Sequence, residues 1–204
     1  MTQARTTIVD AGPTLNFICS GQFQILTDIL KGMQSGLAMP SEVVTEIRGK
    51  AKDSRGGTKF KGADKKLASL LAGDVIEELV PDTADTHLMA AVQRVAQVPY
   101  TARKGRSKDL GEVMVVAHAT VRASPEHVVF VLIDDLDGQT LARRHRTNLI
   151  STEQILKKGI DYGLIGTRGE MKVIYNKLRP FDDGLIHFDQ TTLASKSLYP
   201  KAAA

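Results

Sequence analysis

The sequence predicts an α/β protein, an α/β/α sandwich in which a central, mainly parallel sheet lies between two layers of helices. Apolar, β-rich runs alternate along the chain with segments whose apolar residues have helical spacing, which is typical of strand–helix–strand units. Residues 128–133 (VVFVLI) are apolar throughout, as expected for a strand covered on both faces. With 204 residues, 42% of them hydrophobic, the chain is long enough to bury the core of one such domain.

Short apolar runs and turn residues divide the first half of the chain into elements. Residues 6–9 predict a buried first strand, which Ala11-Gly12-Pro13 ends. Apolar residues at helical spacing predict one helix over residues 14–30. The elements expected next are a minimal strand at 37–39, a helix at 42–47, a basic glycine-rich loop at 48–62, a helix at 64–71, a strand at 75–80 and a helix at 83–97.

In the second half, a basic loop at 100–108 precedes a helix over residues 109–120. Asp109 and Glu112 have the spacing of a capping box at its start. The elements expected after it are the strand at 128–133, a helix at 138–146, a short strand at 148–150, a turn and helix within 159–178 and a mostly irregular segment at 180–204. We therefore expect a single domain over residues 1–190, with the basic segment 48–66 as an insertion and residues 191–204 as a C-terminal tail.

Positive charge is concentrated in three segments. The formal net charge is +4, and residues 48–66 alone hold eight Lys or Arg against Asp53 and Asp64. The two smaller clusters are Arg103, Lys104, Arg106 and Lys108, and Arg143, Arg144 and Arg146. Such patches attract a phosphate backbone. Each one alone is equally well explained by solvated loops and helix faces.

Compartment follows from cysteine usage and from the absence of long apolar runs. Cys19 is the only cysteine, so an intrachain disulfide is impossible and a reducing, cytoplasmic location is expected. No apolar run approaches the roughly 20 residues of a membrane-spanning helix. No secretory signal precedes the first expected strand, and we expect no membrane partner.

Carboxylates lie at the ends of predicted strands or on the helices that follow them. Because the carboxyl ends of parallel strands meet at one edge of a sheet, these acids are expected to converge. Two unit charges 4 Å apart repel by about 4 kcal/mol at an effective dielectric constant of 20, so a divalent cation is expected among them. The candidate residues are Asp10, Glu46, Glu112 and the pair Asp134 and Asp135, with Asp137 as a further candidate.

Each acid also has a simpler explanation. Asp10 suits a turn, Glu46 a water-facing helix surface, and Glu112 the first turn of a helix, where the helix dipole favours negative charge. Asp134 and Asp135 are harder to explain in this way. Neighbouring residues of a strand point to opposite faces, so one of the two is expected to face the site.

The order of these segments resembles the PIN-domain family of metal-dependent ribonucleases over nearly the whole chain. TTIVDAGPTLNFI is similar to the family's first strand with its opening aspartate, and MPSEVVTEI to the segment with its helix glutamate. VIEELVPDTADTHLMAAVQRVA resembles the next strand and helix, and DLGEVMVVAHA the helix whose first acid is a metal ligand. VVFVLIDDLDGQTLARR resembles the strand that ends in the last acid, and GLIGTRGEMKVIYNKL the tail of the branch with GE and DD motifs.

This resemblance implies hydrolysis of RNA phosphodiester bonds assisted by Mg²⁺ or Mn²⁺, with single-stranded RNA as the substrate. Asp10, Glu112 and Asp134 or Asp135 would hold the metal, and Glu46 would orient or deprotonate the attacking water or complete a second site. The best-known relatives are toxins of type II toxin–antitoxin pairs, so an antitoxin partner and a homodimer are also implied. Many members carry a hydroxyl residue two positions after the first aspartate. Here that position is Gly12, and Thr14 is the candidate replacement.

Two other functions remain open from the sequence. Asp135-Leu136-Asp137-Gly138 resembles the DxDG signature of haloacid-dehalogenase-type phosphatases, whose first aspartate is a nucleophile. That motif normally ends an early strand, and here too little of the chain follows it. A non-catalytic PIN-like module that binds RNA or protein is the third possibility, and substitution of the acids distinguishes it from a nuclease.

Overall fold

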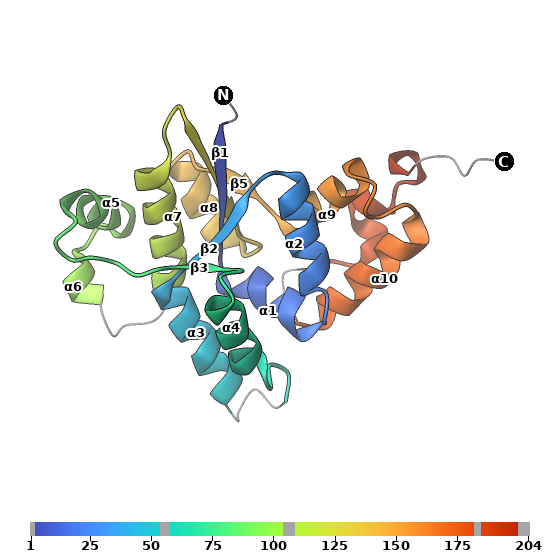
Figure 1. Ribbon diagram of the computed structural model, residues 1–204, viewed down its shortest axis with the longest axis horizontal. Coiled ribbons are helices and arrows are strands. Elements are labelled where there is room, and N and C mark those ends of the chain that lie inside the picture. The colour runs from blue at the N-terminus through green and yellow to red at the C-terminus, as the bar shows by residue number, and fades with distance from the viewer. Residues whose placement is uncertain (1–2, 54–57, 104–108, 182–184, 200–204) are drawn as a thin grey trace.

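The structure is a computed structural model that describes residues 3–53, 58–103, 109–181 and 185–199. Figure 1 labels its strands and α-helices. Their order is β1 (Ala4–Val9), α1 (Ala11–Cys19), α2 (Phe23–Gly32), β2 (Gly36–Pro40), α3 (Ser41–Lys52), α4 (Ala63–Ala72), β3 (Glu77–Leu79), α5 (Thr86–Ala96), α6 (Tyr100–Arg103), α7 (Leu110–Arg122), β4 (His127–Leu132), α8 (Leu136–Arg144), β5 (Asn148–Ile150), α9 (Thr152–Asp161) and α10 (Arg168–Leu178). Four 3-10 helices follow: η2 (Arg179–Phe181), η3 (Phe188–Gln190), η4 (Thr192–Ala194) and η5 (Lys196–Leu198).

The five strands form one parallel sheet in the order β3-β2-β1-β4-β5, which confirms the predicted fold class. The longest pairing joins β1 to β4, from Ala4 opposite His127 to Val9 opposite Leu132. From β1 the chain builds outward first through β2 and β3, and then on the other side through β4 and β5. The order therefore reverses between β1 and β4. Open α/β sheets bind ligands at the carboxyl ends of the strands at such a point.

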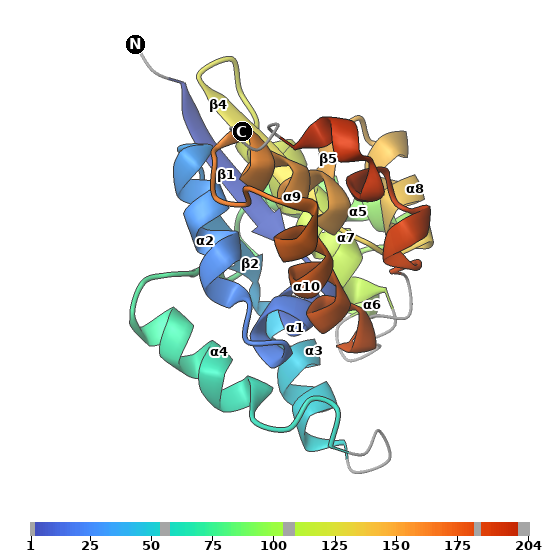
Figure 2. The same cartoon turned by 90° about the vertical axis from the view of Figure 1, so that its right-hand side faces the viewer.

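Helices cover both faces of the sheet and complete an α/β/α sandwich. Helix α7 packs across β1, β2 and β4, and α5 packs on its outer side. In Figure 2 the opposite face is in view, with α2, α9 and α10 in front of the strands. Because the sheet is covered on both faces, its central strands are buried on both sides, as the run at 128–133 predicted.

The core lies between the sheet and these two helical layers. Ile8, Val131 and Met114 are fully buried, and so is Phe17 of α1. Helix α7 is buried along most of its length, from Leu110 to Ala119. A helix that is apolar over most of its surface belongs in the interior of a domain. This burial fixes the position of the start of α7 near the edge of the sheet.

The helix predicted over residues 14–30 is in fact two helices. Helix α1 ends at Cys19 and α2 begins at Phe23. Gly21 between them has a φ of +71°, a left-handed conformation that glycine adopts without strain. This break turns α2 across the sheet while α1 stays at the sheet edge. The predicted strand at 75–80 is also shorter, since only Glu77–Leu79 pair with β2.

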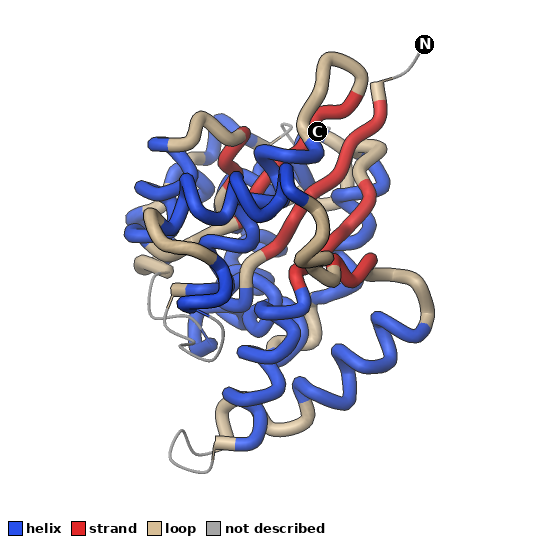
Figure 3. The backbone as a smooth tube through the Cα atoms, turned by 90° about the vertical axis from the view of Figure 1, so that its left-hand side faces the viewer, coloured by secondary structure: helices blue, strands red, loops and turns tan. Residues whose placement is uncertain are grey.

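The first residues of the basic segment are helical, so the prediction of a loop at 48–62 is wrong for its first part. Helix α3 continues to Lys52 and carries Arg48 and Lys50, and α4 begins at Ala63. Residues 54–57 lie outside the described residues. Lysine and arginine are good helix formers, and exposed Gly49 weakens the helix without ending it. Helices α3 and α4 pack together and project from the body of the domain in Figure 3.

Packing of the C-terminal region extends beyond residue 190. Leu193 of η4 is fully buried, and η4 contacts α9 and α10. Helix α9 was not predicted, although Ser151 and Gln154 form a complete capping box at its start. Within the described ranges, none of the helices combines the length and the apolar character needed to cross a membrane.

Candidate functional site

The ends of β1 and β4 meet at the point where the strand order reverses. The backbone N–H of Asp10, the first residue after β1, donates to the carbonyl oxygen of Leu132, the last residue of β4, at 3.1 Å. The chain then enters α1 from β1, and enters α8 from β4 after a short turn. The acids that follow the two strands are therefore brought to one edge of the sheet, as the sequence predicts.

Asp10 lies buried at this edge, with 7% of its surface exposed. Burial and, to a smaller extent, the nearby Glu46 carboxylate raise the pKa of its carboxyl to about 6. The backbone N–H groups of Ala11 and Gly12, and the more distant Lys50, lower it only in part. The Asp10 side chain is thus a buried acid with too little positive charge around it. This imbalance is what a bound cation would correct.

Thr14 does not take the place of the hydroxyl residue missing at Gly12. Its hydroxyl donates to the backbone carbonyl oxygen of Asp10 at 2.8 Å, one turn back along α1. Thr14 is fully buried in this position. It therefore holds the start of the helix rather than facing the carboxylates.

Glu46 reaches the same place from α3. A Cβ atom on Gly111 would lie 3.0 Å from Glu46 Oε2 and 3.6 Å from Asp10 Oδ1, so both carboxylates flank the start of α7. The other oxygen of Glu46 accepts from Lys50 Nζ at 2.7 Å. Glu42, one turn earlier, turns away and accepts from the Tyr100 hydroxyl at 2.8 Å. Of the two glutamates of α3, only Glu46 belongs to the site.

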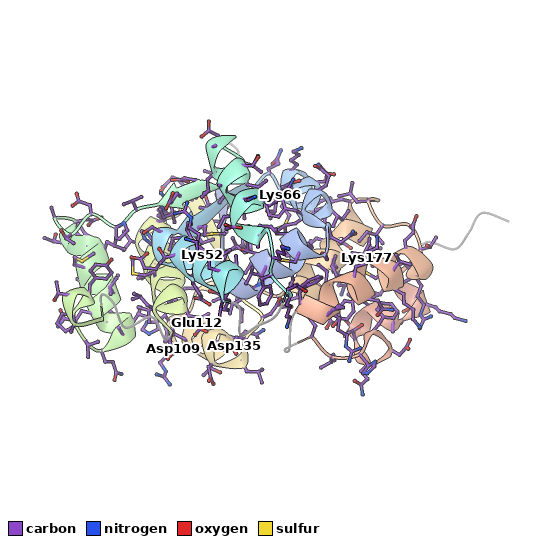
Figure 4. All side chains as sticks on the ribbon, turned by 90° about the horizontal axis from the view of Figure 1, so that it is seen from below. Lys52, Lys66, Asp109, Glu112, Asp135 and Lys177 are labelled. Carbon is purple, nitrogen blue, oxygen red and sulfur yellow. The ribbon has the colours of Figure 1, made fainter. Side chains whose placement is uncertain are left out.

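Glu112 enters from the first turn of α7. Burial, together with the charges of Asp10, Asp135, Asp109 and Glu46, raises the pKa of its carboxyl to about 8. Gly138 of α8 lies against it, because a Cβ there would come within 3.0 Å of Glu112 Cδ. Figure 4 shows Glu112, Asp109 and Asp135 next to one another on this face. Glu112 is the acid on which the fields of the other four converge.

The predicted capping box at the start of α7 is wrong. Asp109 occupies the N-cap position with a φ of +63°, and its side chain makes no capping hydrogen bond. An N-cap residue normally has β-region backbone angles, which let its side chain reach the first N–H groups of the helix. The left-handed backbone of Asp109 does not place its side chain there. Asp109 instead adds negative charge beside Glu112.

Asp134 and Asp135 point to different partners. The carboxylate of Asp134 accepts from Thr152 at the start of α9, from the backbone N–H at 2.7 Å and from the hydroxyl at 2.5 Å. Asp135 caps α8, accepting from the N–H groups of Asp137 and Gly138 at 2.8 and 2.9 Å. Asp135 is also the one whose charge acts on Glu112. Of the two predicted candidates, Asp135 therefore lies with the cluster, while Asp134 joins β4 to α9. Asp137 lies on the exposed first turn of α8.

Positive charge borders the acids on the side of α3. Lys50 and Lys52 are exposed in its last turn. Arg143 of the third cluster bonds to Gln139 within α8, at 2.9 Å. In the second cluster, residues 104–108 lie outside the described residues. The described part of the site is thus a group of acids with basic side chains at its rim.

The donor chemistry of the site suits a hard divalent cation, but the donors are not gathered around one point. Within the described ranges, no three His, Cys, Asp or Glu side chains are grouped so that they could together hold a metal ion. The nearest acids offer only carboxylate oxygens, which Mg²⁺ and Mn²⁺ prefer. The raised pKa values of Asp10 and Glu112 mark uncompensated negative charge. The residues therefore fit such an ion in the chemistry of their donors, and Asp10, Glu112 and Asp135 are the ones that would hold it.

Comparison with known proteins adds nothing to this picture. No protein-family model, no curated protein and no solved structure matches the chain. The conclusions on function below therefore rest on the residues and on the fold.

Three residues of the site were not found from the sequence. Lys50 follows Glu46 by four positions, a helical Glu–Lys spacing that could have been recognised. Gly111 and Gly138 let α7 and α8 approach the carboxylates closely, since a Cβ at either would touch an acid at about 3 Å. The sequence signal in each case was a glycine in the first turn of a helix. Gly111 directly precedes Glu112, and Gly138 directly follows Asp137.

The raised pKa values predict that Glu112 weakens the fold as the pH rises. When the pKa of a group is higher in the folded than in the unfolded state, its contribution to the free energy of unfolding is fully present in acid. That contribution is lost as the pH rises through the folded-state pKa. For Glu112 this window runs from about 4.5 to about 8. We expect the free energy of unfolding of Glu112→Gln, relative to wild type, to rise across this window and level off above it. Urea unfolding in chelator between pH 4 and 9 measures the difference, and a flat difference contradicts the prediction.

Proposed function

We propose that this protein is a metal-dependent endoribonuclease of the PIN-domain type that hydrolyses phosphodiester bonds of single-stranded RNA. The observation that carries the proposal is the meeting of Asp10, Glu46, Glu112 and Asp135 at the reversal of strand order. These four come from separate segments, and the charges of the other three all raise the pKa of Glu112. A purely structural role for so much mutually repelling charge at one edge is hard to justify.

Each acid has a distinct role in the proposal. Asp10, Glu112 and Asp135 hold the cation, and Glu46 orients the attacking water. When bound, Mg²⁺ or Mn²⁺ supplies positive charge to the phosphate oxygens and acidifies water. The raised pKa of Glu112, about 8, reflects burial and repulsion among the acids, which a bound cation would relieve by favouring the ionised carboxylate.

The basic side chains next to the acids hold the RNA. Lys50 and Lys52 lie on the same helix as Glu46, and α4 adds exposed Lys65 and Lys66 to the same projection. Cations along the projection attract the backbone without reading its sequence. Single-stranded RNA is favoured because a paired strand would obstruct access of the phosphate to acids as buried as Asp10.

Removal of metal is expected to abolish cleavage. Purified protein is incubated with a mixture of single-stranded RNAs in Mg²⁺, in Mn²⁺ and in excess chelator, and the products are separated by gel electrophoresis. We expect cleavage with either metal and none in chelator, because the acids repel the phosphate when no cation lies between them.

The same assay separates the alternatives. Cleavage that persists in chelator contradicts a metal-dependent mechanism. RNA that is bound but never cleaved favours a non-catalytic module. Hydrolysis of p-nitrophenyl phosphate without RNA cleavage favours the phosphatase alternative, with Asp135 as the nucleophile. In the present structure the Asp135 carboxylate is already engaged as a helix cap.

The partners follow from the same proposal. As the toxin of a type II toxin–antitoxin pair in the cytoplasm, the protein would be silenced by an antitoxin that covers the acidic edge. A homodimer is also proposed from the family resemblance. Co-expression with the product of the adjacent reading frame tests the first partner, and light scattering tests the second.

A further inference from the structure

A basic cleft lies in the C-terminal region, separate from the acids. It has a volume of about 730 Å³ and is lined by α10, η2 and η3, with polar side chains Lys172, Asn176, Arg179 and His187. Helix α10 and η2 pack against α1, whose first turn follows Asp10. Helix α1 therefore begins at the acidic edge and packs against the elements that line the cleft. Figure 4 shows Lys177 of α10 well apart from Glu112, Asp109 and Asp135.

Within the described residues, the cleft has more positive than negative charge. Its one lining acid, Asp189, is shared by two cations, Arg168 at 2.8 Å and Lys172 at 3.4 Å. The polar partner that the described residues offer Arg179 is the ring nitrogen Nε2 of His187, 3.1 Å from the guanidinium. Asp182 and Asp183 lie outside the described residues. Arg179 thus keeps N–H groups that can be offered to an anion.

One cation that lines the cleft, Lys172, and the neighbouring Arg168 lie over an aromatic ring. Arg168 and Lys172 lie over the ring of Phe188, at 5.3 and 5.9 Å from its centre. Phe188 is buried and packs against Tyr175 at 5.8 Å between ring centres. Its ring is therefore unavailable for stacking on a base, and it fixes the side chains above it instead. In the cleft, Lys172 held over this ring and the guanidinium fork of Arg179 match a phosphate group better than they match a planar base.

We propose that this cleft binds a phosphate group of the RNA backbone, outside the segment that is cleaved. The inference rests on the proposed ribonuclease function for its choice of RNA as the source of the phosphate. A strand held here and at Lys50 and Lys52 would cross α1, and its intervening part would pass the acids. The cleft adds affinity without sequence preference, since backbone contacts carry no base information.

The test measures binding and cleavage separately. Binding of a fluorescein-labelled 20-nucleotide single-stranded RNA is measured by anisotropy in chelator at several salt concentrations, for wild type, Lys172→Gln, Arg179→Gln and the control Lys157→Gln. Lys157 is an exposed cation of α9 that does not line the cleft. We expect a loss of about fivefold in affinity per cleft variant at 0.1 M salt, with a salt slope shallower by about 0.7. The control is expected to bind like wild type, and thermal unfolding verifies that all variants fold.

Every outcome decides the proposal. Equal affinity and equal salt slope in all four proteins overturn it, whether or not RNA is cleaved. Tight binding of adenosine monophosphate that depends on Arg179, with RNA binding unchanged, also overturns it and makes the cleft a mononucleotide site. Weakened RNA binding in the cleft variants supports it. If wild type then fails to cleave RNA with Mg²⁺ or Mn²⁺, the ribonuclease proposal fails while the cleft stands.

Discussion

Asp10→Asn is expected to abolish RNA cleavage and, in the absence of metal, to stabilise the fold. Cleavage should fall at least about 100-fold, because an amide supplies one neutral oxygen where the carboxylate supplied a charged metal ligand. Stability should rise at pH 8 by about 1–3 kcal/mol, because the charged form of this buried acid is unfavourable in the folded state. The pKa of Asp10 is raised to about 6, so the gain should vanish below about pH 4, where wild-type Asp10 is protonated in both states.

The measurement combines RNA cleavage with urea unfolding at pH 4, 6 and 8, with and without Mg²⁺. Mg²⁺ should stabilise wild type and leave Asp10→Asn nearly unchanged, since ligand binding stabilises only a state that holds the site. Asp161→Asn is the matched control, because Asp161 is exposed and, among the described residues, forms an ion pair with Lys158 alone, in the last turn of α9. A variant Asp10→Asn that cleaves like wild type would remove Asp10 from the site. A variant destabilised at pH 8 would mean that its charge is compensated in the fold.

The sheet and the acidic edge were predictable because their signals are local and strong. The apolar run 128–133, which forms most of β4 and is followed at once by Asp134 and Asp135, is typical of a central parallel strand whose end meets solvent. The same holds for β1 and Asp10, and two such strands in one parallel sheet must end at the same edge. That Asp10 and the aspartates after β4 lie at one edge therefore followed from the fold class alone.

Errors arose where tertiary geometry decides among local possibilities. The apolar spacing over residues 14–30 is helical throughout, and only the φ of +71° at Gly21 divides it. Asp109 and Glu112 have capping spacing, yet the left-handed backbone of Asp109 places its side chain beside Glu112 instead. Neither conformation leaves a signature in a single sequence, because glycine and aspartate are common in both arrangements.

The separation of Asp134 from Asp135 could not be predicted either. Alternation along a strand indicates that two neighbours point apart, but not which of them faces the site. That choice depends on Thr152, which lies 18 positions later and is brought against Asp134 by the pairing of β4 with β5. Thr152 is fully buried there, so the contact is part of the core rather than a surface accident.

We expect Asp134→Ala to destabilise the fold and Asp135→Asn to remove cleavage. Asp134 accepts two hydrogen bonds from Thr152 at the positive end of α9, and their loss should lower the free energy of unfolding by about 2–3 kcal/mol. Asn is nearly as good an N-cap as Asp, so Asp135→Asn should keep α8 intact and change stability by less than about 0.5 kcal/mol. The substitution removes the charge of Asp135, however, which is one of those that act on Glu112. Cleavage by Asp135→Asn should therefore fall about 100-fold.

Urea unfolding and RNA cleavage per folded molecule are measured for both variants, for Thr152→Val and for the double variant Asp134→Ala/Thr152→Val. If Asp134 acts only through Thr152, the destabilisation of the double variant should be clearly smaller than the sum of the two single effects. Asp134→Ala should also keep most of its cleavage once corrected for the folded fraction. The reverse result, with stable but inactive Asp134→Ala and active Asp135→Asn, would place Asp134 at the metal. The bonds to Thr152 would then be the means by which the fold aims that carboxylate, because a residue whose loss leaves stability intact cannot be the one that joins β4 to α9.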